Sequence, residues 1–228
     1  LSLKGAPRNS DVSAVGGKMA FELRDTCDGW AINQRNLMIL ESVEGLTRRV
    51  GSRLTTWEAN DGSAFRFIVN KDYGTGGGEV FEGKAERDPS GAAKAIFTTP
   101  GEVGIKLPAD VMFPIQHTIA LLERIATGEK FFSVPLFDGS ELEPAGFVSA
   151  AIGLETVPKA AAWPLISGPY WPVRLAFFGP VDNTGIPDYE LAVDLHENGI
   201  ARRLEIHFEE FTVNVSLQRL ERLEAVGC

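Results

Sequence analysis

Hydrophobic and polar residues alternate along most of this chain, which is the pattern of half-buried β-strands. The clearest stretches are residues 12–24, 30–40, 49–58, 63–70 and 188–210. Asn60-Asp61-Gly62 lies between the third and the fourth stretch. Asn, Asp and Gly are the residues that tight turns favour, so we expect a hairpin there.

The last stretch gives the strongest local signal, because Asn198-Gly199 is typical of a two-residue turn of type I′. That turn sets the register of a hairpin over residues 188–210. It pairs apolar residues on one face and opposite charges on the other. The predicted pairs are Tyr189 with Phe208, Leu191 with Ile206, Val193 with Leu204, Asp194 with Arg203 and Glu190 with His207.

One segment departs from the β pattern. Between Pro114 and Thr127 apolar residues recur at helical spacing, with proline suited to the first turn and Gly128 to the end. We expect a long helix there, a proline-rich loop over residues 158–172 and about a dozen strands elsewhere. The mainly β fold predicted is a large curved antiparallel sheet or incomplete spiral barrel, one domain over residues 1–228, with the helix covering an open side.

The chain has 228 residues, a net charge of −9 and a pI of about 4.9. This acidity disfavours nucleic acid as a partner, and no run of Lys or Arg offsets it. No apolar run reaches the roughly 18 residues of a transmembrane helix. Composition therefore indicates a globular protein that does not bind nucleic acid and has no transmembrane helix.

The two cysteines, Cys27 and Cys228, lie near opposite ends of the chain. They cannot form a C-x-x-C motif, so a thiolate zinc site or a redox dithiol lacks its ligands. Two interpretations remain open from the residues alone. The cysteines form a disulfide in an oxidising compartment, or they are two unrelated buried thiols.

A search for catalytic groups finds none that form a site. No serine stands in G-x-S-x-G, and Gly74–Gly78 lacks the Lys-Ser/Thr of a phosphate-binding loop. Histidines and carboxylates are explained by cross-strand ion pairs, turns and solvated strand faces. These are His196, His207, Glu190, Glu209, Glu58, Asp61, Glu141 and Glu143. We therefore predict no catalytic residue, no metal site and no cofactor.

Aromatic residues are the remaining signal. Core packing and the lining of an apolar cavity use the same residue types, so composition does not separate the two. His117 stands off the apolar stripe of the predicted helix and is interpreted as a hydrogen-bonding anchor between helix and strand. The candidate cavity or packing residues are Trp30, Trp57, Phe113, His117, Trp163 and Trp171.

Several short motifs occur in an order that resembles a known family. They are Cys27-Asp28-Gly29-Trp30, Trp57-Glu58 with Asp61-Gly62, Phe65-Arg66-Phe67, Phe113-Pro114 with His117, Phe137-Asp138-Gly139 and a C-terminal cysteine. Together they are similar to the alphaproteobacterial envelope-integrity protein B (EipB) family, formerly a domain of unknown function. The resemblance covers the whole chain. Ala59 departs from it, because serine is expected after Trp-Glu.

The resemblance implies a secreted periplasmic protein, with its signal peptide removed and a disulfide between Cys27 and Cys228. It also implies an unclosed β-spiral with a helix, similar in shape to periplasmic lipoprotein carriers and lipoprotein-binding regulators. The implied role is maintenance of the cell envelope. No catalytic residue is carried over from the family.

Three functions are compatible with this sequence. The first is a non-enzymatic protein that binds a lipid, a lipoprotein or a protein partner in or on the curved sheet. The second is an envelope hydrolase acting on glycan or lipid, which needs two converging groups at a cleft. The third is a purely structural brace within a complex.

Overall fold

The computed structural model describes residues 1–228 except 75, 160–162, 181–184 and 225–226. Among these described residues, one α-helix, α1 (Pro114–Thr127), and one short 3-10 helix, η1 (Pro164–Ile166), accompany a large set of strands. The strands are β1 (Ser2–Gly5), β2 (Val12–Asp25), β3 (Gly29–Ser42), β4 (Thr47–Ala59), β5 (Ala64–Asp72), β6 (Gly78–Arg87), β7 (Ala93–Thr99), β8 (Val103–Leu107), β9 (Phe131–Leu136), β10 (Gly146–Ile152), β11 (Tyr170–Phe178), β12 (Tyr189–His196), β13 (Ala201–His207) and β14 (Thr212–Ser216).

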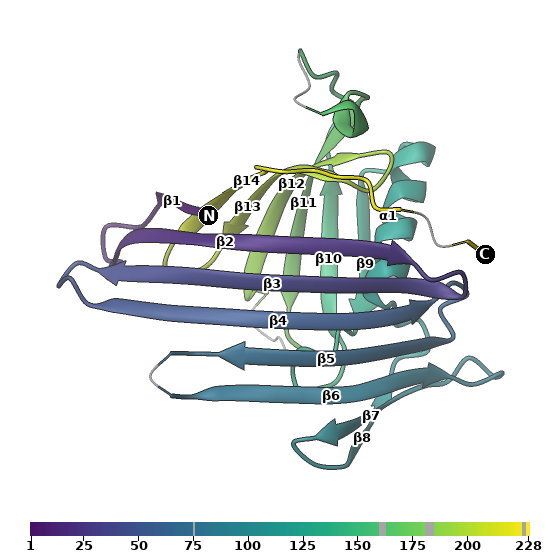
Figure 1. Ribbon diagram of the computed structural model, residues 1–228. Coiled ribbons are helices and arrows are strands. Elements are labelled where there is room, and N and C mark those ends of the chain that lie inside the picture. Colours follow the sequence, from purple (N-terminus) through teal and green to yellow (C-terminus); the bar gives the residue numbers. More distant parts are fainter. Residues whose placement is uncertain (75, 160–162, 181–184, 225–226) are drawn as a thin grey trace.

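The 14 strands of the described residues form one sheet, in the order β8-β7-β6-β5-β4-β3-β2-β1-β14-β13-β12-β11-β10-β9. Neighbours are antiparallel, and the first strand pairs with the last. The two free edges, β8 and β9, therefore come from the middle of the chain, and α1 lies between them in sequence. Figure 1 shows the long strands β2–β6 crossing in front of β9–β14, with α1 at one side. The predicted mainly β, unclosed antiparallel fold is confirmed.

The helix packs against one face of the sheet, which we call the inner face. Leu121 and Ile125 of α1 form a cluster with buried side chains of β10–β12, such as Val148 and Leu175. A second cluster, rich in phenylalanine, covers the inner face of β5–β8 around Phe65 and Phe113. Burial of this apolar area is the main force that holds the helix in the opening between β8 and β9.

The register of the predicted hairpins is largely confirmed. Leu191 pairs with Ile206, Val193 with Leu204, and Glu190 with His207. A bulge then shifts the register, so Leu195 pairs with Ala201 and the predicted pair of Asp194 with Arg203 is wrong. The physical reason is the length of the turn. His196 N–H donates to the carbonyl of Ile200, so the turn has three residues between these two, and Gly199 is left-handed at φ 80°.

The C-terminal tail runs beside an incompletely paired strand. Of the 14 residues of β2, only Gly16 pairs with β1. The described residues 217–224 form no regular element and no backbone hydrogen bond to β2. Figure 1 shows this tail passing above β2 toward the C-terminus.

Candidate functional site

The predicted tryptophan and phenylalanine positions lie on different faces of the sheet. Trp30 is half-buried on the inner face, opposite Glu58, whereas Trp57 is on the outer face. The indole N–H of Trp57 donates to Thr26 Oγ1 at 3.0 Å, and Arg66 lies 5.0 Å from the ring centroid. Trp57 thus supports the turn between β2 and β3.

The other three aromatic candidates are equally dispersed. Phe113 is fully buried directly before α1, with its ring 5.1 Å from that of Phe65. Trp171 packs against the α1 cluster, and Trp163 is half-buried before η1. None of the six candidates lines either of two surface hollows, one over β9–β13 and one beside the start of α1.

Cys27 and Cys228 form a disulfide with their Cα atoms 5.7 Å apart. Cys27 adopts a left-handed conformation with φ 72° in the β2–β3 turn. Its N–H donates to Asp25 Oδ1 at 2.8 Å, and its carbonyl accepts the amide of Asn60 at 2.9 Å. The bond attaches the tail beyond β14 to this turn. It does not join the edges of the sheet, because β14 already pairs with β1.

Glu58 of β4, which is far from α1 in sequence, caps the N-terminus of this helix. The helix has no side-chain cap at Phe113 and no acidic residue in its first turn. The Glu58 carboxylate instead accepts the N–H groups of Ile115 and Gln116, each at 2.8 Å. Its interpretation as a solvated carboxylate is wrong, because Glu58 is 1% exposed. Burial raises its pKa to about 7, and the two backbone hydrogen bonds oppose this rise.

The turn between β4 and β5 fits closely against this helix start. Gly62 has φ +65°, and a Cβ atom there would lie 1.5 Å from Nε2 of Gln116. The predicted Asn60-Asp61-Gly62 turn therefore favours glycine for its left-handed conformation, and a larger residue there would also displace the Gln116 side chain. Sequence reasoning found the turn but not the helix that it touches.

His117 lies in the same part of the helix and is also buried, at 6% exposure. Its ring stacks on Phe132 of β9, with centroids 5.7 Å apart. Burial lowers its pKa to about 4. His117 links the helix to β9, but the predicted hydrogen bond is wrong. The contact is a ring stack, and Nε2 has no hydrogen-bond partner among the described residues.

The larger hollow lies on the outer face of β9–β13 and has a volume of about 400 Å³. Its floor is formed by small residues, including Ala151 and Ala192, which the register places in one row with Arg174 and Glu205. Phe131 stands at its edge and is 79% exposed. The hollow thus offers an apolar surface bordered by positively and negatively charged side chains.

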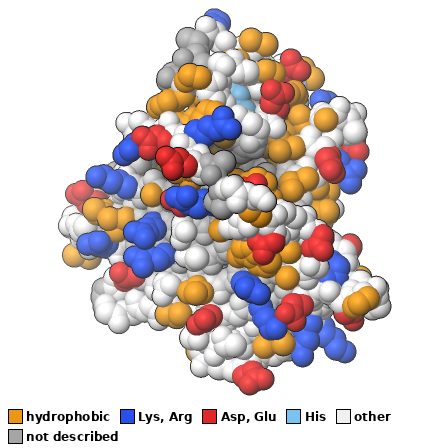
Figure 2. Space-filling model, turned by 45° about the vertical axis from the view of Figure 1, so that its right-hand side comes forward, with side chains coloured by type: hydrophobic (Ala, Val, Ile, Leu, Met, Phe, Trp, Pro, Cys, Tyr) orange, Lys and Arg blue, Asp and Glu red, His pale blue; other side chains and the backbone are white. Residues whose placement is uncertain are grey.

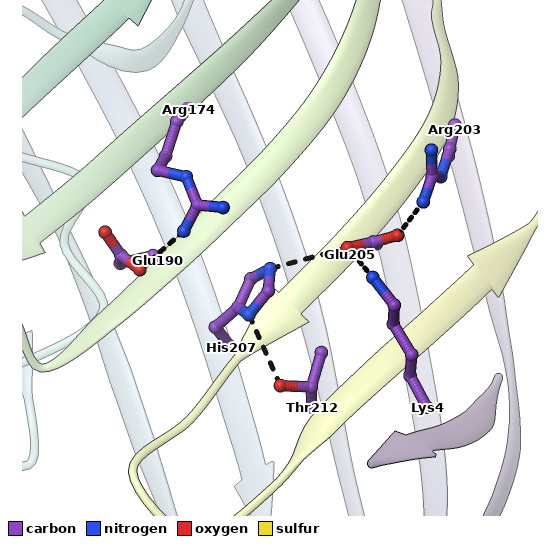
Figure 3. A network of polar contacts seen from close by, with 7 residues as sticks. All are labelled: Lys4, Arg174, Glu190, Arg203, Glu205, His207 and Thr212. Carbon is purple, nitrogen blue, oxygen red and sulfur yellow. Dashed lines mark hydrogen bonds and ion pairs between the residues drawn. The ribbon is translucent and has the colours of Figure 1, made fainter.

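A charged network borders this hollow (Figure 3). Glu205 accepts Lys4 Nζ at 2.5 Å and pairs with Arg203, and His207 Nε2 lies 3.6 Å from its carboxylate. The hydrogen bond from Lys4 lowers the pKa of Glu205. The predicted ion pair of Glu190 with His207 is wrong, although the two residues are in register. Glu190 binds Arg174 at 2.9 Å.

Replacing Glu205 with glutamine is expected to loosen β1, because Lys4 is the side chain of β1 that reaches across β14 to β13. We expect a loss of about 1 kcal/mol in unfolding free energy at pH 7 and faster hydrogen exchange in residues 1–5. The control is Glu86→Gln, whose partner Lys84 is on an exposed face. Equal exchange in both variants would contradict this role for Glu205.

Two of the acidic candidates from the sequence lie in a turn and in an ion pair. The described residues hold no group of three or more His, Cys, Asp or Glu side chains suited to a metal ion. Asp61 accepts the N–H of Ser63 in its turn, and Glu141 pairs with Lys71.

Among the described helices, none is long and apolar enough to cross a membrane.

Comparisons with known proteins agree with this architecture. The sequence is 27% identical over 236 residues to the cell envelope integrity protein EipB of Brucella abortus, covering 97% of this chain and 81% of the relative. The fold is similar to the crystal structure of a beta-barrel-like protein of the domain of unknown function DUF1849 from Brucella abortus. That similarity has a TM-score of 0.84 at 25% identity and covers 94% of this chain and 92% of the other. The EipB-like family profile matches residues 1–224, so this chain belongs to the EipB-like family.

Proposed function

We propose that this chain is a non-enzymatic periplasmic protein that supports the integrity of the cell envelope by binding a partner in its outer-face hollow. The name of the Brucella abortus relative supports the envelope role. The disulfide supports an oxidising compartment such as the periplasm, because disulfides persist there and are rare in the cytosol.

The hollow on β9–β13 is the observation that carries the binding proposal. The inner face is occupied by α1 and by three clusters of buried hydrophobic residues. The outer hollow instead combines exposed Phe131 with a floor of small residues and a charged border. A protein or lipoprotein segment with an apolar side chain beside polar groups fits this chemistry.

The position of the buried titratable groups supports a role without catalysis. Shifted pKa values mark candidate active sites, and Glu58 and His117 have such shifts. Both belong to the packed start of α1, where Glu58 already accepts two backbone N–H groups. The alternative, an envelope hydrolase, would need these groups to meet substrate, yet they are 1% and 6% exposed.

The test is complementation of a strain that lacks the gene. We expect wild-type protein to restore detergent resistance and the double variant Phe131→Ser/Ala151→Arg, which alters the edge and floor of the hollow, to fail at normal protein levels. The control is Phe147→Ser, an exposed aromatic of β10 outside the hollow. Full complementation by the double variant would overturn the role of the hollow. Bound lipid recovered by mass spectrometry from purified protein would favour an interior lipid site instead.

A further inference from the structure

We propose that the outer face of β2–β4, together with the tip of the β3–β4 hairpin, docks on a membrane surface rich in anionic lipids. The surface is separate from the hollow on β9–β13. The inference rests on the proposed function only for the envelope location that brings such a membrane within reach.

The centre of this surface is a pair of like charges. Arg35 of β3 lies directly opposite Arg53 of β4, and both are exposed on the outer face. Neither has a carboxylate partner among the described residues. Like charges directly opposite each other in a sheet destabilise it. An external anion that binds both guanidinium groups removes this repulsion.

Other basic residues extend the pair into a patch. The register places Arg24 of β2, which forms an ion pair with Glu22 at 2.5 Å, in one outer-face row with Trp57 and Arg66. Lys18 and Arg49 lie on the same face toward the other end. Figure 2 shows several Lys and Arg side chains at the left, where this face of the sheet is turned, with Asp and Glu side chains among them. The patch is local, because the whole chain has a net charge of −9.

The hairpin tip beside this patch exposes two aliphatic side chains, with the exposed Glu44 between them in sequence. Val43 is 66% exposed and Leu46 69% exposed. The tip is nevertheless ordered by its backbone, since Ser42 N–H donates to Leu46 O at 2.9 Å and Val43 N–H donates to Asp11 O at 2.8 Å. Thr47 follows in sequence, and then Arg48 and Arg49, of which Arg49 lies on the outer face. Exposed aliphatic side chains next to basic ones are typical of segments that enter the headgroup region of a membrane.

A membrane explains both features, whereas an acidic protein explains only one. The arginines alone would suit either partner. The long strands β3 and β4, 14 and 13 residues, extend about 45 Å and so present a broad basic surface. A bilayer offers anionic headgroups across that length and an apolar layer for Val43 and Leu46 at its end. We therefore favour anionic lipid as the partner.

The test is sedimentation of the purified, oxidised full chain with vesicles. We expect binding to phosphatidylcholine vesicles that contain phosphatidylglycerol, little binding to phosphatidylcholine alone, and weaker binding at high salt. Arg35→Glu/Arg53→Glu should lower the affinity at least about 25-fold, since each basic side chain near the surface contributes about five-fold. The matched control is Lys94→Glu/Lys106→Glu, a directly opposed basic pair on β7 and β8 with the same charge change.

The apolar tip is tested separately. Val43→Ser/Leu46→Ser should weaken vesicle binding about ten-fold, and the remaining binding should be more sensitive to salt. Leu154→Ser/Val157→Ser, two exposed aliphatic residues outside the patch, should bind as wild type. Melting temperatures verify that all variants are folded.

Three results would overturn the proposal. They are equal binding to both kinds of vesicle, equal losses in the β3–β4 and β7–β8 charge variants, and binding to poly-glutamate without binding to vesicles. The last result would assign the patch to an acidic protein. Each is measured on purified protein, so it is distinct from failure of complementation by the hollow variant.

Discussion

A Cys27→Ser variant is expected to unfold with a free energy about 5 kcal/mol lower than that of the wild type and to keep its 14-stranded sheet. The disulfide joins residues separated by 201 positions. It therefore removes a large closure entropy from the unfolded chain, within the chain-entropy model. The folded sheet keeps its ladders, because the bond lies in a turn and a tail outside them.

Urea denaturation followed by circular dichroism measures this effect. Wild type under reducing conditions should match Cys27→Ser, and Cys228→Ser should match both. Reductant should have no effect on either variant, which is the internal control. An unchanged denaturation midpoint for reduced wild type would show that the bond does not stabilise the fold.

The second large effect concerns pH. The folded-state pKa of His117 is lowered from 6.5 to about 4, so folding binds fewer protons at this residue. This contribution to stability is present above about pH 6.5 and is lost as the pH falls toward 4, at a cost of about 3 kcal/mol. His117→Phe should abolish that loss while retaining the ring stack on Phe132.

The contribution of Glu58 to stability changes with pH in the opposite direction, over an overlapping pH range. Its folded-state pKa is raised from 4.5 to about 7, so its contribution is present below about pH 4.5 and is lost as the pH rises toward 7. In wild type the two slopes largely cancel between these values. His117→Phe should thus reveal a stability that falls by about 3 kcal/mol as the pH rises from 4.5 to 7. Glu58→Gln should reveal the reverse slope.

Urea denaturation from pH 4 to pH 8 measures the unfolding free energies of wild type and the two variants. These values test the opposed pH dependences of His117 and Glu58. The expected result is a crossing of the two variant curves. Parallel curves for all three proteins would mean that neither group titrates differently in the folded and unfolded chain. Because the glutamine keeps the volume of Glu58, the comparison is between charges and not between cavities.

Glu58 also shows why a site can be visible in sequence and still be misjudged. Trp57-Glu58 belongs to a motif of the family resemblance, and its alternation correctly placed it on a strand. Its partners are the N–H groups of Ile115 and Gln116, which are 57 and 58 positions away. The one available signal was the absence of an acidic residue in the first turn of the predicted helix, which leaves its N–H groups to another element.

The sequence by itself determined the local elements. The period of two defined strands such as β5, where Phe65, Phe67 and Val69 share a face. The helical period, Pro114 and Gly128 defined α1 within its observed bounds. These signals are local, because the chemistry of a few neighbouring residues is enough to select a backbone conformation.

Only the tertiary structure decided which residues each face of a strand contacts. Alternation separates two faces of a strand, but the course of the whole sheet decides which one packs against α1. The outer hollow exists because β10, β11, β12 and β13 align Ala151, Arg174, Ala192 and Glu205 in one row. The Arg35–Arg53 pair and the long-range cap of Glu58 arise in the same way. Such contacts depend on strand order and register, and a bulge such as that near Asp194 changes them while leaving the local pattern intact.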